Sequence, residues 1–459
     1  MLDRLEHHAK SLDGYTELRW HANHAVRVAM RKGALLQNTE AHEGGVSARC
    51  YRSGAFGFAS QPGDGDAAIA AALAEARGNA ALYERAAGTR AATLPQTPLG
   101  TGVYDYRSKR PPLSASTRID LLRELDDAIA RKYPGLLNAD IVLSSLAVEK
   151  ALVTSEGAAT YSYVPRTVLF FTLSLQANDG PVELYDVVSG LGDLQDQGLA
   201  AVRLMERVDA LYEELRAKAE GTHCEAGKHD VVLDSHVAGI LAHEAIGHTC
   251  EADSVLSGSI AGDWLGREVA SQKITLGDYG GRGPDGRSDF AIHVDDEGTP
   301  CRDVTIIENG VLKGFLHNKD TARELGAEPT GNARAFAFAD EPLVRMRNTA
   351  ILPGRDKLGE MIAAVDRGYY LTRSNNGQAD WTSEFMFGIT QGYEIRNGKL
   401  GRAIRDTTIS GVAFDMLKTV THVGDTIAWL PSSWCGKKQM IQVGMAGPAI
   451  KCRITIGGQ

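Results

Sequence analysis

The segment LAHEAIGHTCEAD, residues 241–253, constrains the fold more than any other part of the chain. His243 and Glu244 open it like the HExxH signature of zinc proteases, in which two histidines four residues apart bind zinc beside a Glu general base. Here the second histidine, His248, follows the first by five residues. On a regular helix five residues advance by about 500°, so the two rings would point about 140° apart. A shared metal ion therefore requires a backbone that departs from a regular helix.

Gly247, directly before His248, indicates how the backbone could depart. Glycine commonly ends a helix because it adopts left-handed dihedral angles at little cost. A π-bulge, which inserts one residue into a helical turn and is frequent at functional sites, would have the same effect. Either change would bring His243 and His248 to one metal ion.

A catalytic zinc site also needs a third protein ligand and an open position for water. The residues alone leave five candidates for this ligand: Glu251, Asp253, Cys250, His422 and Cys435. Glu251 and Asp253 have an alternative role, because metal-bound histidines usually donate their second N–H to a carboxylate or a carbonyl. The spacing does not choose among the five.

Composition limits the class of protein. A chain of 459 residues with 43% hydrophobic and 23% charged residues is typical of a globular protein with two or three domains. The net charge of −9 argues against a nucleic-acid partner. No apolar run reaches the ~18 residues of a membrane span, and the N-terminus lacks the apolar region of a signal peptide. Six cysteines without a dense pattern favour a reducing compartment, and the expected location is the cytoplasm.

The patterns predict an α+β fold in three blocks. Residues 1–95 are expected to form a small N-terminal α/β domain, with an Ala-rich helix at 67–87 and a Pro-containing linker at 94–113. Residues 112–222 form a middle α/β domain, with a helix starting at Ser116 or Thr117 and a long closing helix. Residues 228–459 form a larger, mostly antiparallel-β domain that carries the metal-site helix and two Asn-Gly hairpins, at 304–318 and 392–404.

Other polar segments receive structural interpretations. The loop at 277–288 lacks the Lys-Ser/Thr ending of a P-loop, so a mobile lid or a plain loop is predicted. Arg345, Arg347 and Asn348 are interpreted as polar strand positions rather than substrate contacts. Cys250 lies near enough to the motif to compete for metal, and the remaining cysteines except Cys435 receive no functional role.

The residues AGILAHEAIGHTCEAD resemble the HExxxH segment of the TldD/PmbA metalloprotease family, in its metal-bearing TldD branch. The similarity continues in order along essentially the whole chain. It includes GGVSARCYRSGAFGFAS, DDEGTPCRDVTIIENGVLKGFLHNKDTARELG, NGQADWTSEFMFGITQGYEIRNGKLGRAIRDTTISG and the late SSWCGKKQMIQVGMAGPAIKC. Cys250 and Trp434 depart from the family pattern, and they bear on the polarity of the site.

The resemblance implies a ligand set of His243, His248 and Cys435, the last from the Cys-Gly-Lys segment, with Glu244 as general base. It implies one Zn²⁺ per subunit, although iron or another divalent metal would tolerate the same ligands. The implied enzyme is a peptidase that hydrolyses small or unfolded peptides through a metal-activated water. A metallohydrolase of non-peptide amides stays open.

The resemblance also implies a dimer that encloses the site, formed with a second copy or with a metal-lacking paralogue. The alternative function is a non-catalytic partner subunit, because one branch of the family has lost the metal ligands. This chain keeps every one of them.

Overall fold

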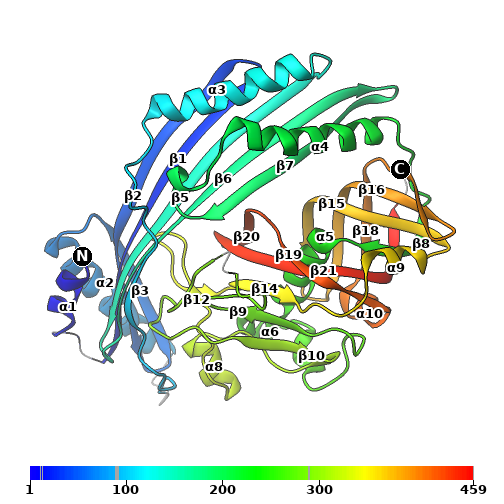
Figure 1. Ribbon diagram of the computed structural model, residues 1–459. Coiled ribbons are helices and arrows are strands. Elements are labelled where there is room, and N and C mark those ends of the chain that lie inside the picture. The colour runs from blue at the N-terminus through cyan, green and yellow to red at the C-terminus, as the bar shows by residue number, and fades with distance from the viewer. Residues whose placement is uncertain (11, 13, 88–92, 288–289, 458–459) are drawn as a thin grey trace.

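The computed structural model describes residues 1–10, 12, 14–87, 93–287 and 290–457. A long, curved seven-stranded sheet arches over a C-terminal body built on a twelve-stranded sheet (Figure 1). Most neighbouring strands in both sheets run antiparallel, and the helices flank the sheets instead of alternating with parallel strands. The predicted α+β class is therefore confirmed.

The curved sheet combines strands from the first two predicted blocks. Its order is β3-β2-β1-β5-β6-β4, and β7 also pairs with β6. Because β1 pairs with β5 along its length, one sheet runs through the segments 1–95 and 112–222. The division into three domains stays a prediction. The strands are β1 (Tyr15–Arg31), β2 (Ala34–Arg52), β3 (Ala55–Pro62), β4 (Thr101–Asp105), β5 (Asn138–Thr154), β6 (Ala159–Ala177) and β7 (Gly180–Leu191).

The segment predicted as a linker at 94–113 contains β4, which pairs in parallel with β6. The linker prediction was wrong for this stretch. The Pro residues on either side of Thr101–Asp105 favoured a loop in the sequence reasoning. In the structure, pairing with β6 gives the backbone N–H and C=O groups of this segment their hydrogen-bond partners.

Helices cover one face of the curved sheet at both of its ends. Alternate residues of a strand share a face, and on β1 Leu18 packs with α1 (Leu2–Ala9) and α2 (Asp66–Ala87). On the same face Val28 packs with α3 (Ala115–Lys132) and α4 (Ala201–Ala219), seen along the top of Figure 1. Helix α3 begins just before the predicted start, because the Ser114 side chain accepts the Thr117 N–H as its N-cap.

The opposite face of the curved sheet looks onto the C-terminal body. There five strands, β8, β15, β16, β18 and β21, pair in a closed ring. Both predicted Asn-Gly hairpins are confirmed, and their turn asparagines, Asn309 and Asn397, have φ of 47° and 51°. Residue 288 lies outside the described residues, and the predicted loop at 277–288 begins inside β9.

The elements of the C-terminal body follow one another closely. Its helices are α5 (Ser235–Leu241), α6 (Ala252–Leu256), α7 (Ala261–Trp264), α8 (Lys319–Leu325), α9 (Leu358–Ala363) and α10 (Ala413–Lys418). Its strands are β8 (Gly227–Leu233), β9 (Leu276–Tyr279), β10 (Val304–Glu308), β11 (Val311–Leu312), β12 (Ala333–Arg334), β13 (Leu343–Val344), β14 (Asn348–Ile351), β15 (Arg367–Ala379), β16 (Glu384–Arg396), β17 (Lys399–Ala403), β18 (Thr407–Val412), β19 (His422–Trp429), β20 (Ser433–Lys437) and β21 (Gln439–Gly457).

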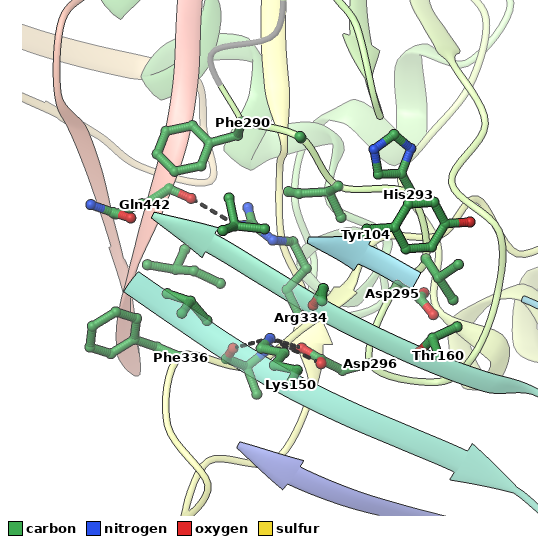
Figure 2. A pocket seen from close by; sticks show the side chains of 18 residues that line it. Tyr104, Lys150, Thr160, Phe290, His293, Asp295, Asp296, Arg334, Phe336 and Gln442 are labelled. Atoms are coloured by element: carbon green, nitrogen blue, oxygen red, sulfur yellow. Dashed lines mark hydrogen bonds and ion pairs between the residues drawn. The ribbon is translucent and has the colours of Figure 1, made fainter. Parts of the chain in front are cut away.

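Buried ion pairs join the curved sheet to this body. Figure 2 shows Lys150 of β5 beside Asp296, with Nζ–Oδ2 at 2.7 Å, in the wall of a cavity of about 90 Å³. Burial lowers the pKa of Lys150 to about 8, although Asp296 opposes this shift. Arg49 similarly reaches Glu297 at 2.6 Å. Among the helices of the described chain, none is both long and apolar enough to cross a membrane.

Candidate metal centre

The HExxxH segment continues directly from the strand ring. Strand β8 ends at Leu233, and the Asp234 side chain accepts the Val237 N–H at 2.9 Å to cap α5. Helix α5 then widens into a π-helical turn over Ala242–Gly247, followed by a 3₁₀ turn over His248–Cys250. The π-helical turn is one of the two departures that the spacing of the histidines predicts, and it rotates His248 back toward His243.

Gly247 fits this turn because it has no side chain, and not because of its dihedral angles. Its φ is −56°, an ordinary right-handed value. A Cβ added at this position would lie 1.9 Å from the sulfur of Met346, which is fully buried. The glycine therefore allows the turn to approach the segment that precedes β14.

Three possible metal-donor atoms converge next to this turn. One ligand atom each from His243, His248 and Cys435 lies within 4.8 Å of the other two. The Cys435 Sγ is 3.2 Å from the His248 Nε2, and the two imidazole rings meet nearly edge to face at 78°, with centroids 5.0 Å apart. Cys435 reaches the cluster from β20, which is held by antiparallel pairing with the start of β21.

His243 provides a test of whether this cluster suits a metal ion. The residue is fully buried, and within the described part of the chain neither of its ring nitrogens has a hydrogen-bond partner. Such an orphaned group is costly in a protein interior. Burial also lowers the pKa of His243 well below its usual value, so the ring is neutral, the form that binds metals. Two imidazole nitrogens and a cysteine sulfur make a donor set suited to zinc.

Glu244 lies on the open side of the cluster. Its carboxylate Oε2 is 3.7 Å from the His248 Nε2, and its side chain is 19% exposed toward a cleft that separates the cluster from the curved sheet. Burial raises the pKa of Glu244 above its usual value, with the charge of His248 acting in the opposite direction. This carboxyl group faces the cleft, where it can exchange a proton with a bound molecule.

A buried carboxylate contacts one of the two histidines of the cluster. Glu251 is fully buried, and its Oε2 lies 2.9 Å from the His248 Nδ1, which leaves the Nε2 directed at Cys435. Lys437, on the same strand as Cys435, places its Nζ 3.1 Å from Glu251 and 2.7 Å from Asp253. Burial alone would raise the pKa of Glu251, but His248 and Lys437 outweigh it and hold that pKa below its usual value.

The other candidates for a third ligand lie outside the cluster. Among the described residues, Cys435 is the one of the five whose donor atom joins the two histidines. Cys250 is buried in the hydrophobic core, where burial raises the pKa of its thiol to about 12. His422 lies on β19 and bonds to Thr421. The assignment of metal ligands stays a prediction.

Two supporting residues were missed by the sequence reasoning. Lys437 could have been found from the Cys-Gly-Lys segment, because residues two apart on a strand share a face and Lys437 therefore lies on the same face as Cys435. Arg345 was expected to be a plain polar position, but it is fully buried and donates from Nη2 to the Cys435 carbonyl at 2.8 Å. Arg347 and Asn348 are also fully buried, and Arg347 pairs with Asp278 at 2.8 Å.

Comparison with known proteins agrees with this geometry. The family model described as PmbA/TldA metallopeptidase C-terminal domain matches residues 226–458, and the model described as PmbA/TldA metallopeptidase domain 1 matches residues 16–80. The protein is a metallopeptidase. More narrowly, it belongs to the TldD/PmbA family.

Curated relatives carry the same class name. A metalloprotease of Methanothermobacter thermautotrophicus is 30% identical over 466 residues, which cover 97% of this chain and 95% of the relative. A zinc metalloprotease TldD homolog of Saccharolobus solfataricus is 34% identical over 241 residues, which cover 52% of this chain and 54% of the relative.

Solved structures share the fold across the whole chain. TldE from Thermococcus kodakarensis matches with a TM-score of 0.76 at 16% identity, covering 98% of this chain and 99% of that one. A structure described as a putative modulator of a DNA gyrase from Thermotoga maritima matches with a TM-score of 0.73 at 22% identity, covering 98% of each chain. At these identities the two similarities concern the fold alone.

Proposed function

We propose that this metallopeptidase is zinc-dependent and hydrolyses small or unfolded peptides, with His243, His248 and Cys435 as metal ligands and Glu244 as general base. The observation that supports the proposal most directly is the convergence of three donor atoms within 4.8 Å, one of them from a buried histidine whose ring nitrogens have no hydrogen-bond partner among the described residues. The Saccharolobus relative is named as a zinc metalloprotease, which favours that metal.

Each residue of the centre has a distinct task. Zinc, when bound, acts as a Lewis acid and lowers the pKa of its water from about 15.7 towards about 7. Glu244 takes the proton of the attacking water on its carboxylate and then delivers it to the nitrogen of the leaving amine. Glu251 fixes the ring orientation of His248 through Nδ1, so that Nε2 faces the metal position.

The catalytic role is favoured over that of a non-catalytic partner subunit. A partner subunit needs neither the donors nor Glu244, whereas this chain retains all four residues and places them together. The dimer expected from the sequence, with a second copy or with a metal-lacking paralogue, belongs to the same proposal, as do the peptide substrate and the cytoplasmic location.

Metal content tests the proposal first. Elemental mass spectrometry of protein prepared without chelator should find one zinc per chain, and Cys435→Ala should lose most of it. Cys250→Ala is the matched control, because this second buried cysteine is near the motif and outside the cluster. Glu244→Gln should keep the zinc and lose hydrolysis of an unfolded reporter peptide. Equal zinc in Cys435→Ala and wild type would contradict the ligand assignment, and a metal-free wild type would contradict the function.

A further inference from the structure

The cleft beside Glu244 has a composition that constrains the substrate. It encloses about 330 Å³ between the open face of the curved sheet and the helix that carries the metal motif. His236, Ile240 and Glu244 follow one another at intervals of four residues, so they line it along one face of that helix. A peptide whose scissile bond lies at Glu244 must therefore place its neighbouring side chains in this cleft.

Two charged groups of the cleft, Arg373 and Asp186, already have partners. Arg373 pairs with Glu214 at 2.8 Å and donates to the Tyr185 carbonyl at 3.0 Å. Asp186 accepts two hydrogen bonds of 2.8 Å each from Arg207, one at each carboxylate oxygen. A charged substrate side chain would have to break one of these pairs, occupy Glu244 itself or remain unpaired in the cleft, and each of these is unfavourable.

The remaining ionisable ring of the cleft is uncharged. Burial lowers the pKa of His236 below its usual value, and the neighbouring Arg373 lowers it further. His236 is therefore neutral near pH 7 and offers no charge to a substrate. Two carboxylates line the described part of the cleft. Asp186 pairs with Arg207, whereas Glu244 has no Lys or Arg side chain beside it.

An apolar wall completes the cleft. Phe170 of β6, Ile240 of α5, Leu430, Trp434 and Met445 line it together. Trp434 is the most informative of them, because its neighbours on β20, Ser433 and Cys435, are buried on the metal side. Strand alternation turns the indole to the opposite face, where it is 38% exposed and packs edge to face on Phe336 at 5.5 Å.

We propose that this cleft selects peptides with a large, uncharged apolar side chain next to the scissile bond, and that Trp434 is the specificity-determining residue. The inference rests on the proposed peptidase function. An apolar substrate side chain buries its surface against Trp434 and Leu430 without disturbing the paired charges.

The magnitude of the selectivity follows from ordinary apolar recognition. Each methylene group that fits or fails to fit a hydrophobic pocket changes kcat/KM by about 10- to 200-fold. We expect wild type to prefer Phe or Leu over Ala by at least about ten-fold at the selected position. Asp and Lys at that position should be cut more slowly than Ala.

The test measures kcat/KM of the zinc-loaded enzyme on one peptide series, in which Phe, Leu, Ala, Asp or Lys occupies each side of the scissile bond in turn. Trp434→Ala should reduce the Phe-to-Ala ratio to about two or less, whereas Trp434→Phe, which retains an aromatic wall, should keep most of it. Leu82→Ala is the control, because Leu82 is an exposed apolar residue of α2, on the helix-covered face of the sheet. Its ratio should equal that of wild type. Zinc content of each variant shows whether the neighbouring Cys435 site has been preserved.

The outcomes separate this inference from the function beneath it. Hydrolysis of all five peptides at similar rates by wild type would overturn the selectivity and leave the peptidase function intact. A preference that survives in Trp434→Ala, with zinc retained, would overturn the role of Trp434. Failure of the zinc-loaded wild type to cut any peptide would overturn the proposed function and this inference with it.

Discussion

Lys437 is expected to hold the two halves of the metal centre together. Its ammonium group contacts Glu251 at 3.1 Å, Asp253 at 2.7 Å and the Val344 carbonyl at 3.0 Å. It therefore links the strand that carries Cys435 to the helical segment that carries the histidines. Lys437→Met keeps most of the length of the side chain and removes its charge, which leaves the fully buried Glu251 with His248 and Arg345 as its charged neighbours.

The structure sets the size of the effect. Removal of one partner from a buried ion pair costs about 3–5 kcal/mol, and the lower end applies here because the Lys437 side chain is 19% exposed. Loss of a group that orients a metal ligand typically weakens metal binding by about 10- to 100-fold. We expect both effects: a lower free energy of unfolding of the apo form by about 3 kcal/mol, and a zinc Kd raised by about 10- to 100-fold.

The assay is zinc competition against a chromogenic chelator, with urea unfolding of the apo protein in parallel. Lys132→Met is the matched control, because the exposed Lys132–Asp209 pair has the same 2.7 Å separation as Lys437–Asp253. Exposed pairs contribute about 0–1 kcal/mol, so this variant should keep the wild-type zinc Kd and nearly all of the stability. A wild-type zinc Kd in Lys437→Met would refute the reasoning, whatever its stability.

Three further predictions concern the surroundings of the site. Burial raises the pKa of Asp234 from 3.8 to about 7, so the folded state holds this proton more tightly than the unfolded state. The free energy of unfolding should therefore fall as the pH rises between these values. Asp234→Asn should flatten this decline, measured as the urea midpoint at pH 5 and pH 8. Gly247→Ala should destabilise the protein by about 1–3 kcal/mol, because the added methyl group overpacks against Met346. Met346→Ala in the same chain should relieve part of this overpacking. The double variant should therefore lose less zinc affinity than Gly247→Ala alone. Arg347→Met should cost about 3–5 kcal/mol by leaving Asp278 buried without its partner, whereas a wild-type unfolding midpoint would show that this pair contributes little.

Local features of the fold could be predicted from the sequence because they depend on neighbouring residues. The Asn-Gly turns require positive φ at the asparagine, and both hairpins form where that pair occurs. The long closing helix predicted for residues 112–222 is α4, and its buried face includes Leu204, Val208, Leu211 and Leu215. The five-residue spacing of the histidines required an irregular helix, and the π-helical turn supplies it.

Features that join distant segments could not be predicted in this way. Alternation shows which residues of β1 share a face but not that β5 is its partner, so the sequence did not show that one sheet runs through the segments 1–95 and 112–222. Cys435 is 187 residues from His248, and its convergence depends on how β20 folds back on β21. Spacing therefore left five candidate ligands open, and only the family resemblance favoured Cys435 among them. The reason for Gly247 also lay in a distant residue, Met346.

The central place of β21 has a consequence for how the enzyme is made. This strand pairs with β8, β14, β18, β19 and β20, so it closes the ring and supports the hairpin that carries Cys435. During synthesis the histidines and Glu244 leave the ribosome long before the strand that positions the thiol. In the proposed site the donor set of a nascent chain is thus unfinished, and we expect peptide cleavage only after β21 has been inserted. If the proposed site is the active one, the order of synthesis keeps the growing chain from cutting peptides before its fold is complete.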